Sequence, residues 1–221
     1  MKDAWGRTIE YVRLSLTDAC NFCCPYCRPA EITPQSQHQL LSVDEWMTIL
    51  GAFHQVGVKA VRLTGGEPLL YPHIEELLAR IKQTGWFEDI SMTTNGSLLA
   101  PRGAKLKELG VNRGNNSRES HDSDAFTLCV GKANQLDSVL SGIQSAIDAG
   151  FTSVKINTVL SRHWTDDEVH DLLHYVETWP VIWRFIEYMP FQGDAFHGPT
   201  FDEWKAQLER VSGGVLTENH D

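Results

Sequence analysis

The sequence predicts an α/β fold, a partial (β/α)6 barrel of the TIM type, and two observations carry this prediction. Strand-like segments alternate with amphipathic helical segments along the 221 residues, and each crossover between parallel strands requires such a helix. Most predicted strands are also apolar on one face only; in the first, Arg13 lies opposite Val12 and Leu14. Central strands of an open doubly wound sheet are apolar on both faces, so we expect the polar faces to line a wet cavity. The site would then lie at the carboxyl ends of the strands.

The elements follow one another in a regular order. The first strand, residues 10–17, alternates polar and apolar residues. A capping box of Ser42 and Glu45 begins a helix that ends at Gly57, and the next strand covers residues 60–64. The remaining strands are predicted at 90–94, near 111–120, at 154–158 and at 181–186, and the remaining helices at 74–84, 102–109, 136–149, 165–178 and 201–210. Six strand–helix units result.

Composition and charge narrow the range of partners. The chain has 42% hydrophobic and 22% charged residues, which are ordinary values for a globular protein. Its formal net charge of −10 argues against binding to nucleic acid or to an anionic membrane. No apolar run approaches the ~20 residues of a membrane span, and the amino terminus lacks the apolar core of a signal peptide. We therefore expect a cytoplasmic protein.

Four of the five cysteines lie within eight residues, a spacing that does not suit a disulfide framework. Cys20, Cys24 and Cys27 have the spacing Cys-x3-Cys-x2-Cys and could hold three irons of a [4Fe–4S] cluster, which leaves the fourth iron open for a ligand. The alternative is a zinc site of two Cys-x2-Cys pairs, but no residue separates these pairs to wrap a tetrahedron. In the cluster interpretation Cys23 is a small filler beside the loop, and Cys129 is an inert thiol.

Motifs after the first three predicted strands resemble the radical S-adenosylmethionine (SAM) superfamily. They are the cysteine loop, Thr64-Gly65-Gly66-Glu67-Pro68 and Thr93-Thr94-Asn95-Gly96. Further stretches, in order and at matching spacing, resemble the GTP 3′,8-cyclase family, the A proteins of molybdenum cofactor biosynthesis. They are residues 11–18, 61–63, 154–159 and 184–190. The fold that this resemblance implies is the partial barrel of the radical SAM type.

The resemblance also implies an activity. The enzymes convert GTP to (8S)-3′,8-cyclo-7,8-dihydroguanosine 5′-triphosphate. A 5′-deoxyadenosyl radical made from SAM abstracts the ribose 3′ hydrogen of GTP, and the resulting carbon radical attacks C8 of the guanine. The expected cofactors are therefore one [4Fe–4S] cluster and SAM. The expected partners are GTP as substrate, an external electron donor and, as in the family, a second copy of the chain in a homodimer.

Roles for individual residues follow from the same resemblance. Cys20, Cys24 and Cys27 would bind the cluster, and the Gly65–Gly66 backbone would approach the methionine part of SAM because no Cβ intervenes. Positions that match cofactor contacts are Tyr26, Gly66, Ser117 and Met189. Positions that match GTP contacts are Arg13, Arg62, Thr93 and Lys155. No residue is assigned as the catalytic acid or base.

The residues themselves support part of this assignment. Arg13, Arg62 and Lys155 lie with Thr93 on the polar strand faces, and cations that line a cavity of an acidic protein suggest an anionic ligand such as a triphosphate. The alternative is that each is an ordinary solvated or ion-paired residue. Glu67 has two interpretations as well: it caps the segment that follows it, or it binds a ligand.

Two features depart from the family. Residues 114–123 contain no β-branched residue, where the family has an apolar strand that ends in a Ser-x-Asp-Ser-like stretch. A central strand without an apolar face loses burial energy, so we interpret residues 114–131 as a short reading-frame error or a decayed segment. The family also has a second cysteine triad near its carboxyl terminus, and this chain has no cysteine after Cys129. We therefore divide the chain into a radical SAM core, residues 1–192, and the start of a truncated C-terminal region, residues 193–221.

Two other hypotheses remain open beside the cyclase. One is a related radical SAM enzyme that acts on another substrate without an auxiliary cluster. The other is a remnant domain that binds a cluster or a nucleotide without turnover. Formation of 5′-deoxyadenosine that depends on GTP would support the cyclase, and we expect this shortened chain alone not to complete the full reaction.

Overall fold

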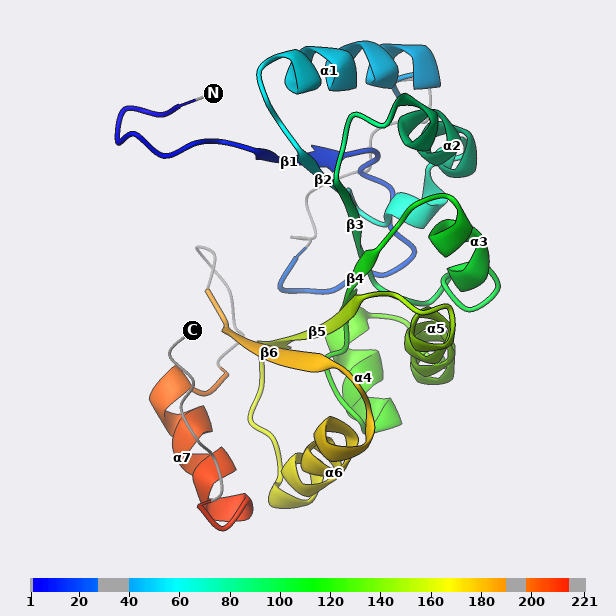
Figure 1. The fold of residues 1–221 in the computed structure, drawn as a ribbon. Coiled ribbons are helices and arrows are strands. Elements are labelled where there is room, and N and C mark those ends of the chain that lie inside the picture. Colours follow the sequence, from blue (N-terminus) through cyan, green and yellow to red (C-terminus); the bar gives the residue numbers. More distant parts are fainter. Residues whose placement is uncertain (1, 28–39, 190–197, 215–221) are drawn as a thin grey trace.

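The computed structural model of the protein describes residues 2–27, 40–189 and 198–214. One parallel sheet runs through it in the order β1-β2-β3-β4-β5-β6. Figure 1 shows the sheet bent into an arc, with the helices on its convex side and the concave side open. The strands are β1 (Tyr11–Ser15), β2 (Ala60–Thr64), β3 (Asp89–Thr94), β4 (Arg113–Ser117), β5 (Ser153–Leu160) and β6 (Ile182–Glu187). The predicted partial barrel is confirmed.

Helices lie between successive strands, and one more helix, α7, follows the last strand. They are α1 (Val43–Gln55), α2 (Ile74–Thr84), α3 (Gly103–Glu108), α4 (Ser123–Val130), α5 (Leu136–Asp148), α6 (Asp166–Thr178) and α7 (Phe201–Val211), with a short 3-10 helix, η2 (Pro68–Leu70). Both bonds of the predicted capping box at Ser42 and Glu45 form at the start of α1. A left-handed Gly85 ends α2, as only glycine does without strain. None of these described helices is long and apolar enough to cross a membrane.

The apolar faces of the strands form the main core. Val61 and Leu63 of β2 are completely buried, and so are Leu50, Leu77 and Leu78 of the covering helices. Burying a side chain of this size stabilises the fold by roughly 1.5–3 kcal/mol. The opposite, polar faces of the same strands are left on the concave side, where the sequence analysis expects a wet cavity.

A second, smaller core joins α6 and α7. Trp204 of α7 is 1% exposed, and its ring centroid lies 5.4 Å from that of Trp164. Arg210 donates to Asp166 at 2.8 Å across the same pair of helices. The described part of the predicted C-terminal region therefore packs on the barrel, and the predicted boundary at residue 192 lies outside the described residues.

β4 forms where the fourth strand is predicted, despite its polar composition. It pairs in register with both β3 and β5. Gly114 leaves room for the ring of Phe151, which a Cβ would approach to 3.3 Å. The missing apolar face is visible in the side chains: the amide of Asn116 and the guanidinium of Arg118 are buried without hydrogen-bond partners among the described residues. Helix α4, which follows β4, was not predicted. In the structure, residues 114–131 contain most of β4 and the whole of α4.

Candidate active site

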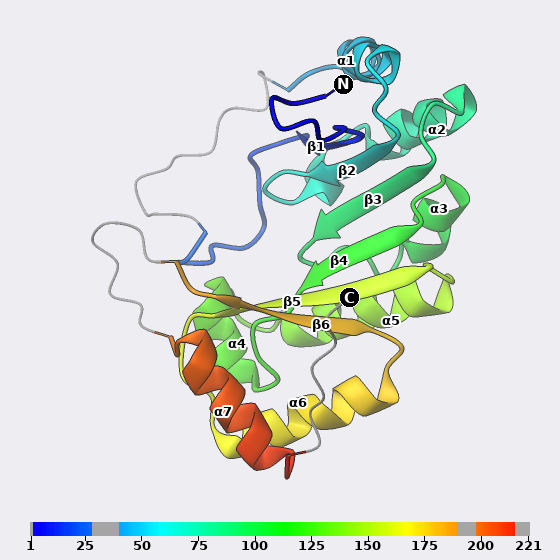
Figure 2. The same cartoon turned by 60° about the vertical axis from the view of Figure 1, so that its left-hand side comes forward.

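The motifs found in the sequence meet at one edge of the sheet. The cysteine loop, residues 20–27, follows β1, the Gly-Gly-Glu-Pro turn follows β2, Asn95 follows β3, and Glu119 lies just beyond β4. Figure 2 shows the arrowheads of β2, β3 and β4 pointing toward the side on which the blue chain after β1 runs. This is the carboxyl edge of the sheet, where enzymes with (β/α) barrels carry their active sites.

The Gly65–Gly66 turn packs against the chain that leads into the cysteine loop. A Cβ on Gly65 would lie 2.4 Å from the carbonyl oxygen of Thr17, and one on Gly66 would lie 2.3 Å from that of Ala19. The backbone N–H of Gly66 also donates to the Thr17 carbonyl at 2.7 Å. We expected the missing Cβ atoms to give SAM access to the backbone; in the structure their space is occupied by residues 17–19.

Glu67 joins the turn after β2 to the end of β3. Its carboxylate is completely buried and accepts from the backbone N–H of Leu69 at 3.0 Å, the hydroxyl of Thr94 at 2.8 Å and the backbone N–H of Asn95 at 2.7 Å. Burial raises the pKa of Glu67, and these hydrogen bonds oppose the shift. Of the two interpretations in the sequence analysis, the structure supports the cap: the carboxylate holds two loops together.

Asn95 connects the end of β3 to the first cysteine of the loop. Its amide Nδ2 lies 2.8 Å from Oδ1 of Asn21 and 3.9 Å from Sγ of Cys20. Its Oδ1 accepts from the backbone N–H of Ser97 at 3.0 Å and from the Ser97 hydroxyl at 2.7 Å. The amide of Asn21 in turn donates to the Ser97 hydroxyl at 2.9 Å. Asn95 belongs to one of the motifs found in the sequence, but no role was predicted for Asn21, Asn95 or Ser97.

The middle of the cysteine loop is held by α4. Phe22 is 3% exposed and meets the ring of Phe126 edge to face, with centroids 6.3 Å apart. The backbone N–H of Cys23 donates to the Val130 carbonyl at 2.9 Å. The side chain of Cys23 is exposed, so the prediction that it fills space beside the loop is wrong. The segment interpreted as decayed therefore supports the loop that carries the strongest sequence signal.

Tyr26 ties the far end of the loop to the segment after β4. Its hydroxyl donates to Oε1 of Glu119 at 2.6 Å, and Oε2 of Glu119 accepts from the backbone N–H of Val159 at 2.8 Å. Burial raises the pKa of Glu119 to about 7, and the two hydrogen bonds act in the opposite direction. Glu119 lies two residues beyond Ser117, so the structure brings the predicted cofactor contacts Tyr26 and Ser117 into one region. Sequence reasoning missed Glu119, although it occupies the acidic position of a Ser-x-Asp-Ser-like stretch.

The thiols of the loop have unequal environments. Cys20 and Cys24 are half-buried, and Cys27 is exposed. Burial and the neighbouring Glu119 raise the pKa of Cys24 to about 12, and the charges of Cys27 and Cys20 act in the same direction. Within the described residues, no three His, Cys, Asp or Glu side chains are already grouped as a metal site.

The four predicted GTP-contact residues share the concave face of the sheet. Arg13 is in register with Arg62 on the neighbouring strand. Thr93 and Lys155 are each in register with Asn115, from opposite sides of β4. In a parallel sheet, residues in register point to the same face, so the four side chains are neighbours in two rows.

Two further arginines, Arg113 and Arg184, lie on this surface. We call the set of five cations the basic inner face: Arg13, Arg62, Arg113, Lys155 and Arg184. Burial lowers the pKa of Arg62; the nearby Tyr11 opposes this, and the like charges of the other three arginines lower it further. Arg113 is paired with Asp89 at 2.9 Å. Arg113 and Arg184 could have been identified from the sequence, because the alternation of side chains along their strands places them on the same face as the predicted cations.

Arg184 is held differently from Arg113. It donates to Asn157 at 3.0 Å and to Asn115 at 2.7 Å, two neutral acceptors that leave its charge uncompensated by these contacts. Met189, the last predicted cofactor contact, follows β6 with its side chain 76% exposed. The structure therefore gives Arg184 a fixed position on the concave face and leaves Met189 at its carboxyl edge.

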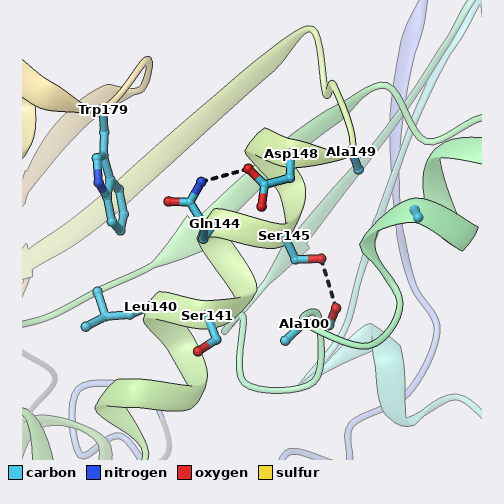
Figure 3. A pocket seen from close by; sticks show the side chains of 9 residues that line it. Ala100, Leu140, Ser141, Gln144, Ser145, Asp148, Ala149 and Trp179 are labelled. Atoms are coloured by element: carbon cyan, nitrogen blue, oxygen red, sulfur yellow. Dashed lines mark hydrogen bonds between the residues drawn. The ribbon is translucent and has the colours of Figure 1, made fainter.

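A hollow of about 650 Å³ is lined by residues of α5, by Ala100 and Ala104, and by Trp179. Figure 3 shows Gln144, Ser145 and Asp148 of α5 on one side of it and Trp179 on another. Gln144 donates to Asp148 at 2.8 Å, and Ser145 donates to the Ala100 carbonyl at 2.9 Å. These polar groups already have partners, and the hollow shares no residue with the cysteine loop or the basic inner face.

Comparisons with known proteins support the resemblance. The profile of the radical SAM superfamily matches residues 14–176. The chain is 40% identical over 213 residues to "GTP 3′,8-cyclase 2" of Pseudomonas aeruginosa, covering 94% of this chain and 64% of that protein. It is 41% identical over 191 residues to the GTP 3′,8-cyclase of Listeria welshimeri, covering 86% of this chain and 57% of that protein. The chain thus spans about 60% of the length of these curated relatives.

Solved structures match at the level of the fold. SuiB of Streptococcus suis bound to S-adenosylmethionine gives a TM-score of 0.72 at 19% identity, covering 94% of this chain and 47% of that one. The coproporphyrinogen III oxidase HemN of Escherichia coli, named as a radical SAM enzyme, gives 0.62 at 16% identity, covering 91% and 50%. These structures confirm the predicted fold class. The profile that matches most of the chain supports the predicted cofactors, a [4Fe–4S] cluster and SAM. The chain belongs to the radical SAM superfamily.

Proposed function

We propose that the chain is the radical-generating core of a GTP 3′,8-cyclase, the enzyme that makes (8S)-3′,8-cyclo-7,8-dihydroguanosine 5′-triphosphate from GTP in molybdenum cofactor biosynthesis. The observation that carries the proposal is the identity of about 40% to proteins of that name over most of the chain. The basic inner face supports it, because several cations on a concave surface suit a triphosphate.

The cysteine loop suits the cluster by its chemistry. Cys20, Cys24 and Cys27 offer three sulfur donors, and thiolates are the ligands that iron–sulfur clusters take. The loop is anchored before Cys20, at residues 17–19, and between Cys24 and Cys27, at Tyr26, so the segments that follow the neighbouring strands hold it in place. When bound, the cluster and SAM supply the 5′-deoxyadenosyl radical. Tyr26, Gly66, Ser117 and Met189 are the residues we propose to contact SAM.

The basic inner face would bind and orient the nucleotide. Arg13, Arg62 and Lys155 would bind the phosphates, with Thr93 as a neutral hydrogen-bonding group in the same rows. Arg62 is half-buried and Arg184 has neutral partners, so both retain charge that an anion can neutralise. The ribose would then face the carboxyl edge of the sheet, where the cysteine loop lies. An external electron donor and a second copy of the chain complete the proposal.

The test is to reconstitute the protein anaerobically with iron and sulfide and to measure 5′-deoxyadenosine formed with dithionite, with and without GTP. We expect about four irons per chain, from the single [4Fe–4S] cluster, and more 5′-deoxyadenosine when GTP is present. Release that GTP does not change would indicate another substrate. Iron binding without any release would indicate a domain that does not turn over.

A measurement of GTP binding tests the nucleotide site independently of the radical chemistry. The variant Arg62→Ala should weaken GTP binding by at least tenfold, because it removes a half-buried cation of the basic inner face. The matched control is Arg80→Ala on α2, an arginine of the outer surface that contacts Asp44. Equal GTP affinity in the two variants would contradict the assignment of the inner face.

A further inference from the structure

Asn95 presents a side-chain donor to a sulfur of the cysteine loop. One Nδ2 atom reaches both the Asn21 oxygen, at 2.8 Å, and Cys20 Sγ, at 3.9 Å. An amide nitrogen carries two N–H groups, so it can donate to both acceptors at once. Sulfur is larger and a weaker acceptor than oxygen, and the longer distance is the one expected for it.

The rest of the network fixes the orientation of this amide. Asn95 Oδ1 accepts twice from Ser97, which leaves Nδ2 pointing toward Asn21 and Cys20. The backbone N–H of Asn95 is held by the buried carboxylate of Glu67 at 2.7 Å. The amide is therefore held from both its backbone and its oxygen, and its N–H groups are directed before any ligand is bound.

We propose that Asn95 is a positioning residue for the cluster, which orients Cys20 and donates an N–H to its sulfur. Hydrogen bonds to cluster sulfurs are one of the features that set the reduction potential of an iron–sulfur site, and they raise it by stabilising the added negative charge. Asn95 would thus make the cluster easier to reduce. This inference depends on the cluster and not on the substrate, so it stands apart from the proposed reaction with GTP.

The test compares Asn95→Leu with Asn112→Leu in reconstituted protein without GTP. Leucine keeps the approximate volume of asparagine but has no N–H, and Asn112 lies just before β4, at the opposite edge of the sheet from the cysteine loop, where its side chain contacts Lys107. The midpoint potential of the cluster is measured by redox titration followed by electron paramagnetic resonance, and iron per chain is measured on the same samples. We expect a more negative potential in Asn95→Leu and a wild-type potential in Asn112→Leu.

A second variant guards against a failure of Asn95→Leu to load iron. Asn95→Ser keeps a side-chain oxygen that can accept from the Ser97 backbone but has no amide to reach Cys20. It should show the same negative shift. Urea unfolding of the cluster-free proteins gives the structural reference: lower stability with an unchanged potential in both Asn95 variants would make Asn95 a purely structural residue and overturn the proposal.

Discussion

Replacing the buried carboxylate of Glu67 with an amide is expected to destabilise the protein although the shape of the side chain barely changes. In Glu67→Gln, the remaining oxygen can keep its bonds to Leu69 and Thr94, but the new NH2 group faces the backbone N–H of Asn95. A hydrogen bond to a charged group contributes about 1.5–3 kcal/mol, and the orphaned N–H of the half-buried Asn95 faces a side chain that is fully buried. We therefore expect a loss of about 2–3 kcal/mol, and about 4 kcal/mol for Glu67→Ala.

The assay is urea unfolding of the cluster-free protein followed by circular dichroism. A loss of this size lowers the midpoint by about 1 M urea when the slope is 2–3 kcal/mol per M. The control is Glu75→Gln, an exposed glutamate on α2 that should leave the midpoint unchanged. If Glu67→Gln unfolds at the same urea concentration as Glu75→Gln, the carboxylate does not join the two loops as argued.

Three further predictions test the cysteine loop and the second core. Gly66→Ala places a Cβ 2.3 Å from the Ala19 carbonyl, so it should lower iron content per chain after reconstitution relative to wild type. Trp204→Ala empties the centre of the second core and should cost about 3–5 kcal/mol in the same urea assay. Burial opposes the low pKa of Glu168, yet hydrogen bonds from Arg162 and from the helix start hold that pKa at about 2. The ionised Glu168 carboxylate should contribute its full stabilisation of the folded protein above pH 4.5 and lose it as the pH falls toward 2. In Glu168→Gln, the urea midpoint should therefore depend less on pH over this range.

The fold was predictable where the structure is determined by signals between residues close together in the sequence. Residues 60–64 and 74–84 were predicted with the bounds that β2 and α2 have, because strand alternation and a terminal Gly85 act within a few residues. Helix α4 was not predicted because the segment before it is polar, and residues 114–131 were interpreted together as an error or a decayed segment. Local composition could not reveal that Arg118, at the end of this segment, lies 4.4 Å from the ring centroid of Tyr175. That packing joins residues more than fifty positions apart.

The candidate site was also predictable only in part from the sequence. The sequence identified the cysteines by spacing and four inner-face residues by strand parity and resemblance. It did not show the close packing of Gly65 and Gly66, where the atoms that exclude a Cβ belong to residues 17–19 of a different loop. It also missed Asn21 and Glu119, whose roles exist only because the loop after β1 reaches the carboxyl ends of β3 and β4.

The cysteine loop shows why these roles depend on tertiary structure. It has no helix or strand of its own, yet it is attached at four places: the turn after β2 at residues 17–19, Asn95 after β3, α4 at Phe22 and Cys23, and Glu119 after β4. A loop outside the helices and strands keeps a defined shape mainly through such attachments. A substitution at any of them should therefore change the behaviour of the cluster without altering a cysteine, and the polar segment after β4 belongs to the machinery of the site as much as the cysteines do.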